Sequence, residues 1–123
     1  MRIFQQIIVI LSLSFAHVPA SFAVDPPYQR EMERLAEIMG SLSFLQPLCG
    51  STQEDWRAQM ADLIALDEPD EDRRQRLAGA FNEGFTGFAR TYRVCTPAAG
   101  QAISRLLTEA EQTARNMHSR YAE

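Results

Sequence analysis

Residues 77–95 read LAGAFNEGFTGFARTYRVC, and this stretch carries the clearest helical signal in a chain of 123 residues. Its large apolar residues recur every three or four positions, which is the period of an amphipathic α-helix. At roughly 100° per residue they fall within an arc of about 80°. They are Leu77, Phe81, Phe85, Phe88, Tyr92 and Cys95. The pattern predicts a helix with one buried face that continues to Cys95.

A strip of small residues runs beside this apolar face. It consists of Ala80, Gly84, Gly87 and Thr91. A glycine inside a helix costs about 1 kcal/mol relative to alanine, so two of them indicate a packing reason. One interpretation is close contact with a neighbouring helix of the same domain. The other is a groove that receives a partner protein or a second copy of the chain.

The sequence that precedes this helix predicts two further helices. Asp25 is expected to cap the first, with Pro26 and Pro27 in its opening turn, and Gly50 is expected to end it in the left-handed conformation. Pro47 should make its last turn irregular. The apolar stripe of this helix comprises Tyr28, Met32, Leu35, Met39, Leu42 and Leu45.

The second helix is shorter. Ser51 and Glu54 form a capping-box pattern before it, and Thr52 with Asp55 is an overlapping alternative. Its stripe comprises Trp56, Met60, Leu63 and Ile64. The acidic run 67–72 then breaks the helix. This run lacks the glycine and the ligand spacing of a calcium loop, so we expect a solvated start of the next helix.

Two further helix starts complete the pattern. Asp70 is placed to cap the third helix, and Thr96 with Pro97 to open the fourth. The stripe of the fourth helix comprises Ala99, Ile103, Leu106, Leu107, Ala110, Ala114, Met117 and Tyr121. No β pattern follows the N-terminal segment. Short connections predict an all-α fold, a small antiparallel up-down-up-down four-helix bundle.

The N-terminus has the layout of a cleavable secretory signal. Arg2 supplies a positive charge, Ile7–Phe15 an apolar run, and 21–23 the small residues of a cleavage site. The apolar run is too short for a transmembrane helix, which needs about 20 residues. We expect export to the periplasm, with cleavage after Ala23 or alternatively after Ala20.

Removal of the signal peptide, residues 1–23, leaves one domain over 24–123. The chain has a formal net charge of −4 and no lysine, and loss of Arg2 moves the charge to near −5. Without clustered positive charge the domain is a poor candidate for binding nucleic acid or anionic membranes. No stable membrane insertion is expected after cleavage.

Cys49 and Cys95 are the cysteines of this exported chain, and an even number in an oxidising compartment predicts a disulfide. In an antiparallel bundle the first and third helices end at the same side, and the two cysteines are their terminal residues. Their spacing excludes CxxC redox chemistry. Closing so long a loop is worth about 4 kcal/mol, so the bridge is expected to stabilise the domain.

Catalytic combinations of residues are missing from the mature sequence. A hydrolase or transferase needs a nucleophile beside a base, or a carboxylate pair. The mature chain has a single histidine, His118, and no free thiol once the disulfide forms. The Glu-x-x-His pairs of di-metal bundles are also absent from the sequence. We expect a non-enzymatic protein without cofactor or metal.

Two alternatives remain open. A b-type haem would use Met32 and His118 as axial ligands at one end of the bundle. His118 lies about 60° off the apolar stripe of its helix, which counts against this alternative. Arg90 and Arg93 complement the dipole at the end of the third helix, or they bind an acidic partner or a carboxylate ligand.

The segments LAEIMGSLSFLQPLCG, WRAQMADLI and RLAGAFNEGFTGFARTYRVCTPAA resemble a family of small exported alphaproteobacterial proteins, domain of unknown function 2385. The resemblance covers residues 28–121. Its markers are Leu48–Gly50, Phe81–Phe85 and Tyr92–Pro97, which are specific in combination. It implies export and paired cysteines, and it implies no activity.

The sequence therefore predicts a periplasmic helical protein that acts through protein contacts in the cell envelope. Its expected partner is an unidentified protein or a second copy of the chain. The small-residue strip is the expected contact surface, because two glycines are unusual in a helix with so strong an apolar stripe.

Overall fold

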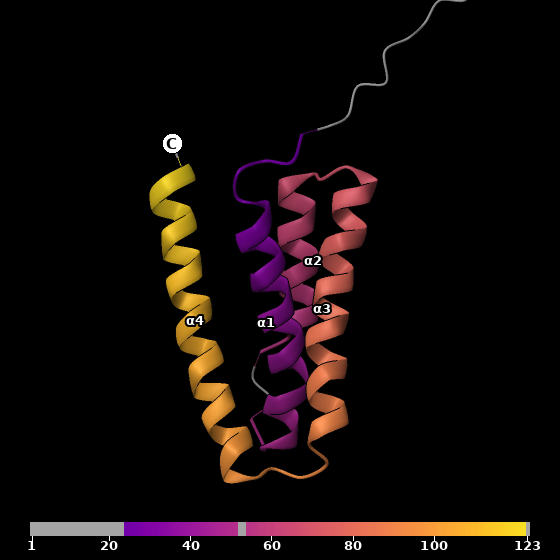
Figure 1. Ribbon diagram of the computed structural model, residues 1–123, viewed down its shortest axis with the longest axis vertical. Helices are drawn as coiled ribbons and strands as arrows, with labels where there is room; N and C mark the ends of the chain where they lie inside the picture. The colour runs from indigo at the N-terminus through magenta and orange to yellow at the C-terminus, as the bar shows by residue number, and fades with distance from the viewer. Residues whose placement is uncertain (1–23, 52–53, 123) are drawn as a thin grey trace, which may run out of the picture.

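The computed structural model describes residues 24–51 and 54–122, and within these ranges it contains four α-helices and no strand. The helices are α1 (Gln29–Leu48), α2 (Trp56–Asp67), α3 (Glu71–Thr91) and α4 (Pro97–Tyr121). Figure 1 shows them as rods lying side by side. The expected all-α fold with four helices is confirmed. The predicted signal peptide over 1–23 lies outside the described residues.

The central helix is α1. It contacts each of the other three helices, and in Figure 1 α4 lies on one side of it and α3 on the other. The side chains of Arg73 and Gln29 are hydrogen-bonded at 2.7 Å, which joins the first turns of α3 and α1 and shows that they run in the same direction. Arg34, early in α1, bonds Glu109 in the middle of α4 at 2.7 Å, and α4 runs the opposite way.

Two clusters of buried apolar side chains occupy the two sides of α1. The α3-side cluster lies between α1, α2 and α3 and consists of Met32, Ala36, Met39, Met60, Leu77 and Phe81. The α4-side cluster lies between α1 and α4 and consists of Ile38, Leu42, Leu45, Ala99, Ala102 and Leu106. Because α1 contributes to both clusters, it is the helix that the other three cover.

The backbones of α1 and α3 touch at two glycines. A Cβ atom on Gly40 would lie 1.8 Å from the carbonyl oxygen of Phe81, and one on Gly84 would lie 2.0 Å from that of Glu37. Any side chain larger than hydrogen would force the helices apart, because a packed interior has no space to absorb it. Gly84 is the expected packing glycine, and Gly40 is its counterpart on α1, which the sequence analysis did not identify.

Three helix ends follow the predictions. The carboxylate of Asp70 accepts a hydrogen bond from the backbone N–H of Arg73 at 2.8 Å. The hydroxyl of Thr96 accepts one from the backbone N–H of Ala99 at 3.1 Å. Gly50 has a φ of 78°, the left-handed conformation expected just after α1.

The start of α1 differs from its prediction. The helix begins after Tyr28, which makes no side-chain cap. Asp25 was the predicted cap, and its carboxylate instead bonds Arg76 of α3 at 2.6 Å. At the other end, α1 continues through Pro47 to Leu48 as α-helix, where an irregular turn was expected.

The start of α2 also differs. Asp55 is the cap, and its carboxylate accepts a hydrogen bond from the backbone N–H of Ala58 at 3.0 Å. The capping box of Ser51 and Glu54 is therefore wrong, because the helix begins only at Trp56.

The end of α3 was predicted one turn too late. The helix ends at Thr91, and Tyr92 is already extended with φ −117° and ψ 131°. A residue before proline avoids the helical conformation, and Thr96 before Pro97 is extended as well, with ψ 165°. Cys95 lies in the connection to α4.

Candidate functional site

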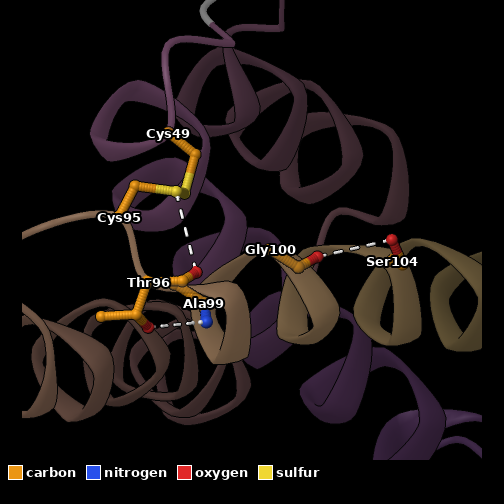
Figure 2. The surroundings of a disulfide bond; sticks show 6 residues. All are labelled: Cys49, Cys95, Thr96, Ala99, Gly100 and Ser104. Atoms are coloured by element: carbon orange, nitrogen blue, oxygen red, sulfur yellow. Dashed lines mark hydrogen bonds between the residues drawn. A yellow bond between two sulfur atoms is a disulfide. The ribbon is translucent and has the colours of Figure 1, made fainter.

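A disulfide joins the predicted cysteines. Cys49 caps the C-terminus of α1, and Cys95 lies in the connection between α3 and α4, with their Cα atoms 4.9 Å apart. Figure 2 shows the bridge next to Thr96, the residue that caps α4. The pairing is confirmed. Because α4 begins immediately after Cys95, the bridge ties the end of α1 to the start of α4.

The four residues of the small-residue strip do not share one surface. Gly84 is buried against α1, and Ala80 is half-buried against the α3-side cluster. Gly87 and Thr91 are exposed, and the Thr91 hydroxyl donates a hydrogen bond to the carbonyl oxygen of Gly87 at 3.0 Å. Apart from the backbone of its own helix turns and its chain neighbours, no atom of the described structure lies within 4 Å of a Cβ position on Gly87. The first half of the strip is packing, and only the second half faces outward.

The two arginines singled out in the sequence lie beside this exposed half. Arg90 and Arg93 are exposed, and within the described residues neither has an acidic partner. Six other arginines form ion pairs, namely Arg34, Arg73, Arg74, Arg76, Arg115 and Arg120, whereas Arg30, Arg57 and Arg105 form none within the described residues. Val94, which follows Arg93, is 66% exposed.

These residues together form what we call the arginine surface: Gly87, Arg90, Thr91, Arg93 and Val94. It runs from the last turns of α3 into the connection that carries Cys95. Guanidinium groups on such a surface favour carboxylates, which they bind through paired N–H donors. The arrangement suits an acidic binding partner.

A buried ion pair lies at the opposite end of α3. Arg73 bonds the carboxylate of Asp67 at 2.5 Å, and their side chains are only 9% and 12% exposed. The hydroxyl of Tyr28 donates to the same carboxylate at 2.5 Å. This hydrogen bond raises the pKa of Tyr28 above its usual value, and burial adds to the shift. Asp67 was expected to be solvated, and it is instead the anchor that holds the α2–α3 turn against α1.

An apolar groove of about 340 Å³ adjoins this ion pair, between the start of α1 and the ends of α2 and α4. We call it the end groove. Its lining residues are Tyr28, Met32, Leu63, Leu66, Asp67, Met117, His118, Tyr121 and Ala122. Leu66 is 82% exposed at its rim. Three helices therefore meet around an apolar surface at the end of the domain remote from the disulfide.

The proposed haem ligands Met32 and His118 both line the end groove, but the haem alternative gains no support. Met32 is 5% exposed and packs within the α3-side cluster, whereas His118 is exposed. A porphyrin between them would have to displace core side chains around Met32.

No three His, Cys, Asp or Glu side chains in the described part of the chain gather in a way that could hold a metal ion. None of the described helices is both long and apolar enough to span a membrane.

Comparison with known proteins gives a family match. A family model described as "Protein of unknown function (DUF2385)" matches residues 27–121. No curated protein and no solved structure matches the chain. The matched range includes all four helices and both cysteines.

Proposed function

Because the chain belongs to the DUF2385 family of proteins of unknown function, no activity follows from the match, and we propose a function from the residues themselves. The protein is exported to the periplasm, where the domain over 24–123 acts without catalysis, as an antiparallel bundle that binds a protein partner in the cell envelope. The arginine surface is the contact site, and the partner presents carboxylates to it.

Export is supported by two independent features. The first is the layout of residues 1–23, with Arg2 before an apolar run and small residues before the cleavage point. The second is the bridge between Cys49 and Cys95. Disulfides persist in oxidising compartments such as the periplasm and are rare in the reducing cytosol.

A non-catalytic role is supported by the chemistry available in the mature chain. Its cysteines are consumed by the bridge, and no free cysteine occurs among the described residues. Its one histidine, His118, is exposed on the last turn of α4. Its side chain makes no hydrogen bond or ion pair with the residues that the structure describes. The pairing of nucleophile and base that acyl or phosphoryl transfer needs is therefore not assembled around it.

The observation that carries the contact proposal is a pair of exposed arginines, three residues apart beside exposed Val94, that have no acidic partner among the described residues of an acidic protein. The chain has 16 carboxylates against 12 basic residues, and six arginines already pair with them. Arg90 and Arg93 stand apart from these pairs, next to exposed Val94 and the open space above Gly87. Aligned charges of this kind guide association and select the partner.

The test is crosslinking and affinity capture from periplasmic extract with a matched pair of variants. Arg90→Glu with Arg93→Glu reverses the arginine surface. Arg30→Glu reverses an exposed arginine at the other end of the domain. We expect a defined captured protein that is lost with the first variant and kept with the second. Equal capture by both variants would disprove the contact site.

Export is tested separately by cell fractionation. The full-length chain should appear in the periplasmic fraction with a mature N-terminus at Val24, as determined by N-terminal sequencing. A chain lacking residues 2–23 should remain cytoplasmic. Retention of the full-length chain in the cytoplasm would disprove the export proposal without affecting the contact site.

A further inference from the structure

The methionines of this protein are concentrated in one place. The chain has five methionines, and apart from Met1 all of them lie in or against the α3-side cluster. Met32, Met39 and Met60 are 5%, 4% and 4% exposed within it, and Met117 of α4 packs against it. Methionine fills irregular gaps well, so a structural role accounts for part of this pattern.

The cluster opens at the end groove with a histidine beside it. Met32 and Met117 both line this groove, and so does His118, the neighbour of Met117 on α4. Two methionines and a histidine thus line one hollow of about 340 Å³. Met117 is half-buried and His118 exposed, which leaves a route for a small ion from solvent.

The oxygen atoms of the same groove are already engaged. The carboxylate of Asp67 receives hydrogen bonds from Tyr28 and Arg73, both at 2.5 Å. The hydroxyl of Tyr121 points to the carbonyl oxygen of Pro27 at 3.5 Å. The donors left in the groove are therefore the sulfur atoms of the two methionines and the imidazole nitrogen.

This donor set selects a particular class of metal ion. Thioether sulfur is a soft ligand that favours Cu(I), and imidazole also suits copper, whereas Mg²⁺, Ca²⁺ and Mn²⁺ require oxygen ligands. Among the described residues, no three His, Cys, Asp or Glu side chains gather in a way that could hold a metal ion. We propose that Met32, Met117 and His118 bind Cu(I) in the end groove. The proposal does not depend on the contact function of the arginine surface, which lies at the other end of the domain.

The direct test is a competition titration. Purified protein with its disulfide intact is mixed under argon with Cu(I), added as its acetonitrile complex, and a chromophoric bidentate chelator reports the copper that the protein removes. We expect one Cu(I) per chain. Met117→Leu and His118→Gln each remove one donor while preserving size, and each should weaken the affinity at least tenfold.

The matched control is Met39→Leu. It makes the same chemical change inside the same cluster, but Met39 does not line the end groove. We expect it to leave the Cu(I) affinity within twofold of the original. Circular dichroism melts establish that all three variants fold, and a thiol assay after the titration establishes that the bridge is intact.

A second measurement locates the ion. With ¹³C-labelled methionine methyl groups, Cu(I) should shift the signals of Met32 and Met117 and leave that of Met39 in place. The proposal is overturned if the chelator keeps all the copper. It is also overturned if Met117→Leu and His118→Gln bind as the original chain does, or if binding appears only after the disulfide is reduced.

Discussion

The two sides of α1 are held by different kinds of contact. On the α3 side, two backbones touch through Gly40 and Gly84. On the α4 side, contact is made by side chains, which are the apolar residues of the α4-side cluster and the pair of Arg34 with Glu109. A backbone contact leaves no atoms that can rotate away, whereas side chains can change rotamer. The α3 side is therefore the rigid half of the domain, and the α4 side is the half with freedom to adjust.

The attachment of α4 follows from this difference. Its buried residues, Ala99, Ala102 and Leu106, all lie in its first half. Its second half contacts the rest of the domain through half-buried Ala110, Met117 and Tyr121 and through the ion pair of Arg120 with Glu31. The ring centroids of Tyr121 and Tyr28 are 5.8 Å apart. The disulfide at the start of α4 thus reinforces the end that is already buried. Local stability should fall from the disulfide toward the C-terminus.

The largest expected effect comes from removing the disulfide. Cys49→Ser with Cys95→Ser, or reduction of the original chain, should lower the free energy of unfolding by about 4 kcal/mol, because the unfolded chain regains the entropy of a long loop. Amide hydrogen exchange should rise more in α4 than in α1 and α3, because Cys95 lies two residues before α4, whereas α3 keeps its backbone contact with α1 at Gly40 and Gly84. The double-serine variant is the control, since reductant should not change its melt. A thermal melt of the original chain that is unchanged by reductant would contradict the prediction.

The next prediction compares two glycines of α3: Gly84, which touches the backbone of α1, and Gly87, which has open space around it. Gly84→Ala should cost about 3 kcal/mol, because the new methyl group meets the backbone oxygen of Glu37 and the helices must move apart. Gly87→Ala lies one turn later with open space around it, and it should stabilise the domain by about 0.5 to 1 kcal/mol through helix propensity. Chemical denaturation measures both. If Gly84→Ala stabilised the domain as Gly87→Ala is expected to do, α1 and α3 would not be in backbone contact at this point.

The fold includes features that the sequence could predict and one that it could not. The number of helices and the caps at Asp70 and Thr96 follow from local patterns, and the disulfide was predicted from the even number of cysteines and the expected export. The partner of Gly84 was missed because Gly40 carries no local signal. Its role depends on the alignment of α1 against α3, which a single sequence does not contain.

The candidate sites show the same limit. Arg90 and Arg93 were identified because their position at a helix end is readable from the chain. Asp67 was misread as solvated, because an acidic run has the same composition whether or not one of its members meets a buried arginine. The grouping of Met32 with Met117 beside His118 depends on how three helices converge, which a single sequence does not contain.

A third effect tests the ion pair on the rigid side. Asp67→Asn should lower the free energy of unfolding by about 2 kcal/mol, because the guanidinium of Arg73 stays largely buried without a charged partner. Asp72→Asn is the matched control, since the Asp72 side chain is 81% exposed, and it should change stability by less than about 0.5 kcal/mol. If the two variants proved equally stable, the buried position of Asp67 would be wrong.

The smallest expected effect concerns the ion pair of Glu109 with Arg34 on the α4 side of α1, and it depends on pH. Hydrogen bonds from Arg34 lower the pKa of Glu109 below its usual value, despite an opposing contribution from partial burial. A carboxyl whose pKa is lowered by folding stabilises the fold at neutral pH, and this stabilisation is lost as the pH falls through the lowered pKa.

Glu109→Gln should therefore cost about 0.5 kcal/mol at pH 7, a small value because both side chains of the pair are more than 40% exposed. The cost should disappear as the pH falls through the lowered pKa of Glu109, where the carboxyl of the original chain becomes protonated. Glu111→Gln, which removes an exposed pair with Arg115 within α4, is the control. It does not connect two helices, so it should leave amide exchange at the end of α4 unchanged, whereas Glu109→Gln should accelerate it. If Glu109→Gln left that exchange unchanged at pH 7, the pair with Arg34 would not hold α4 against α1.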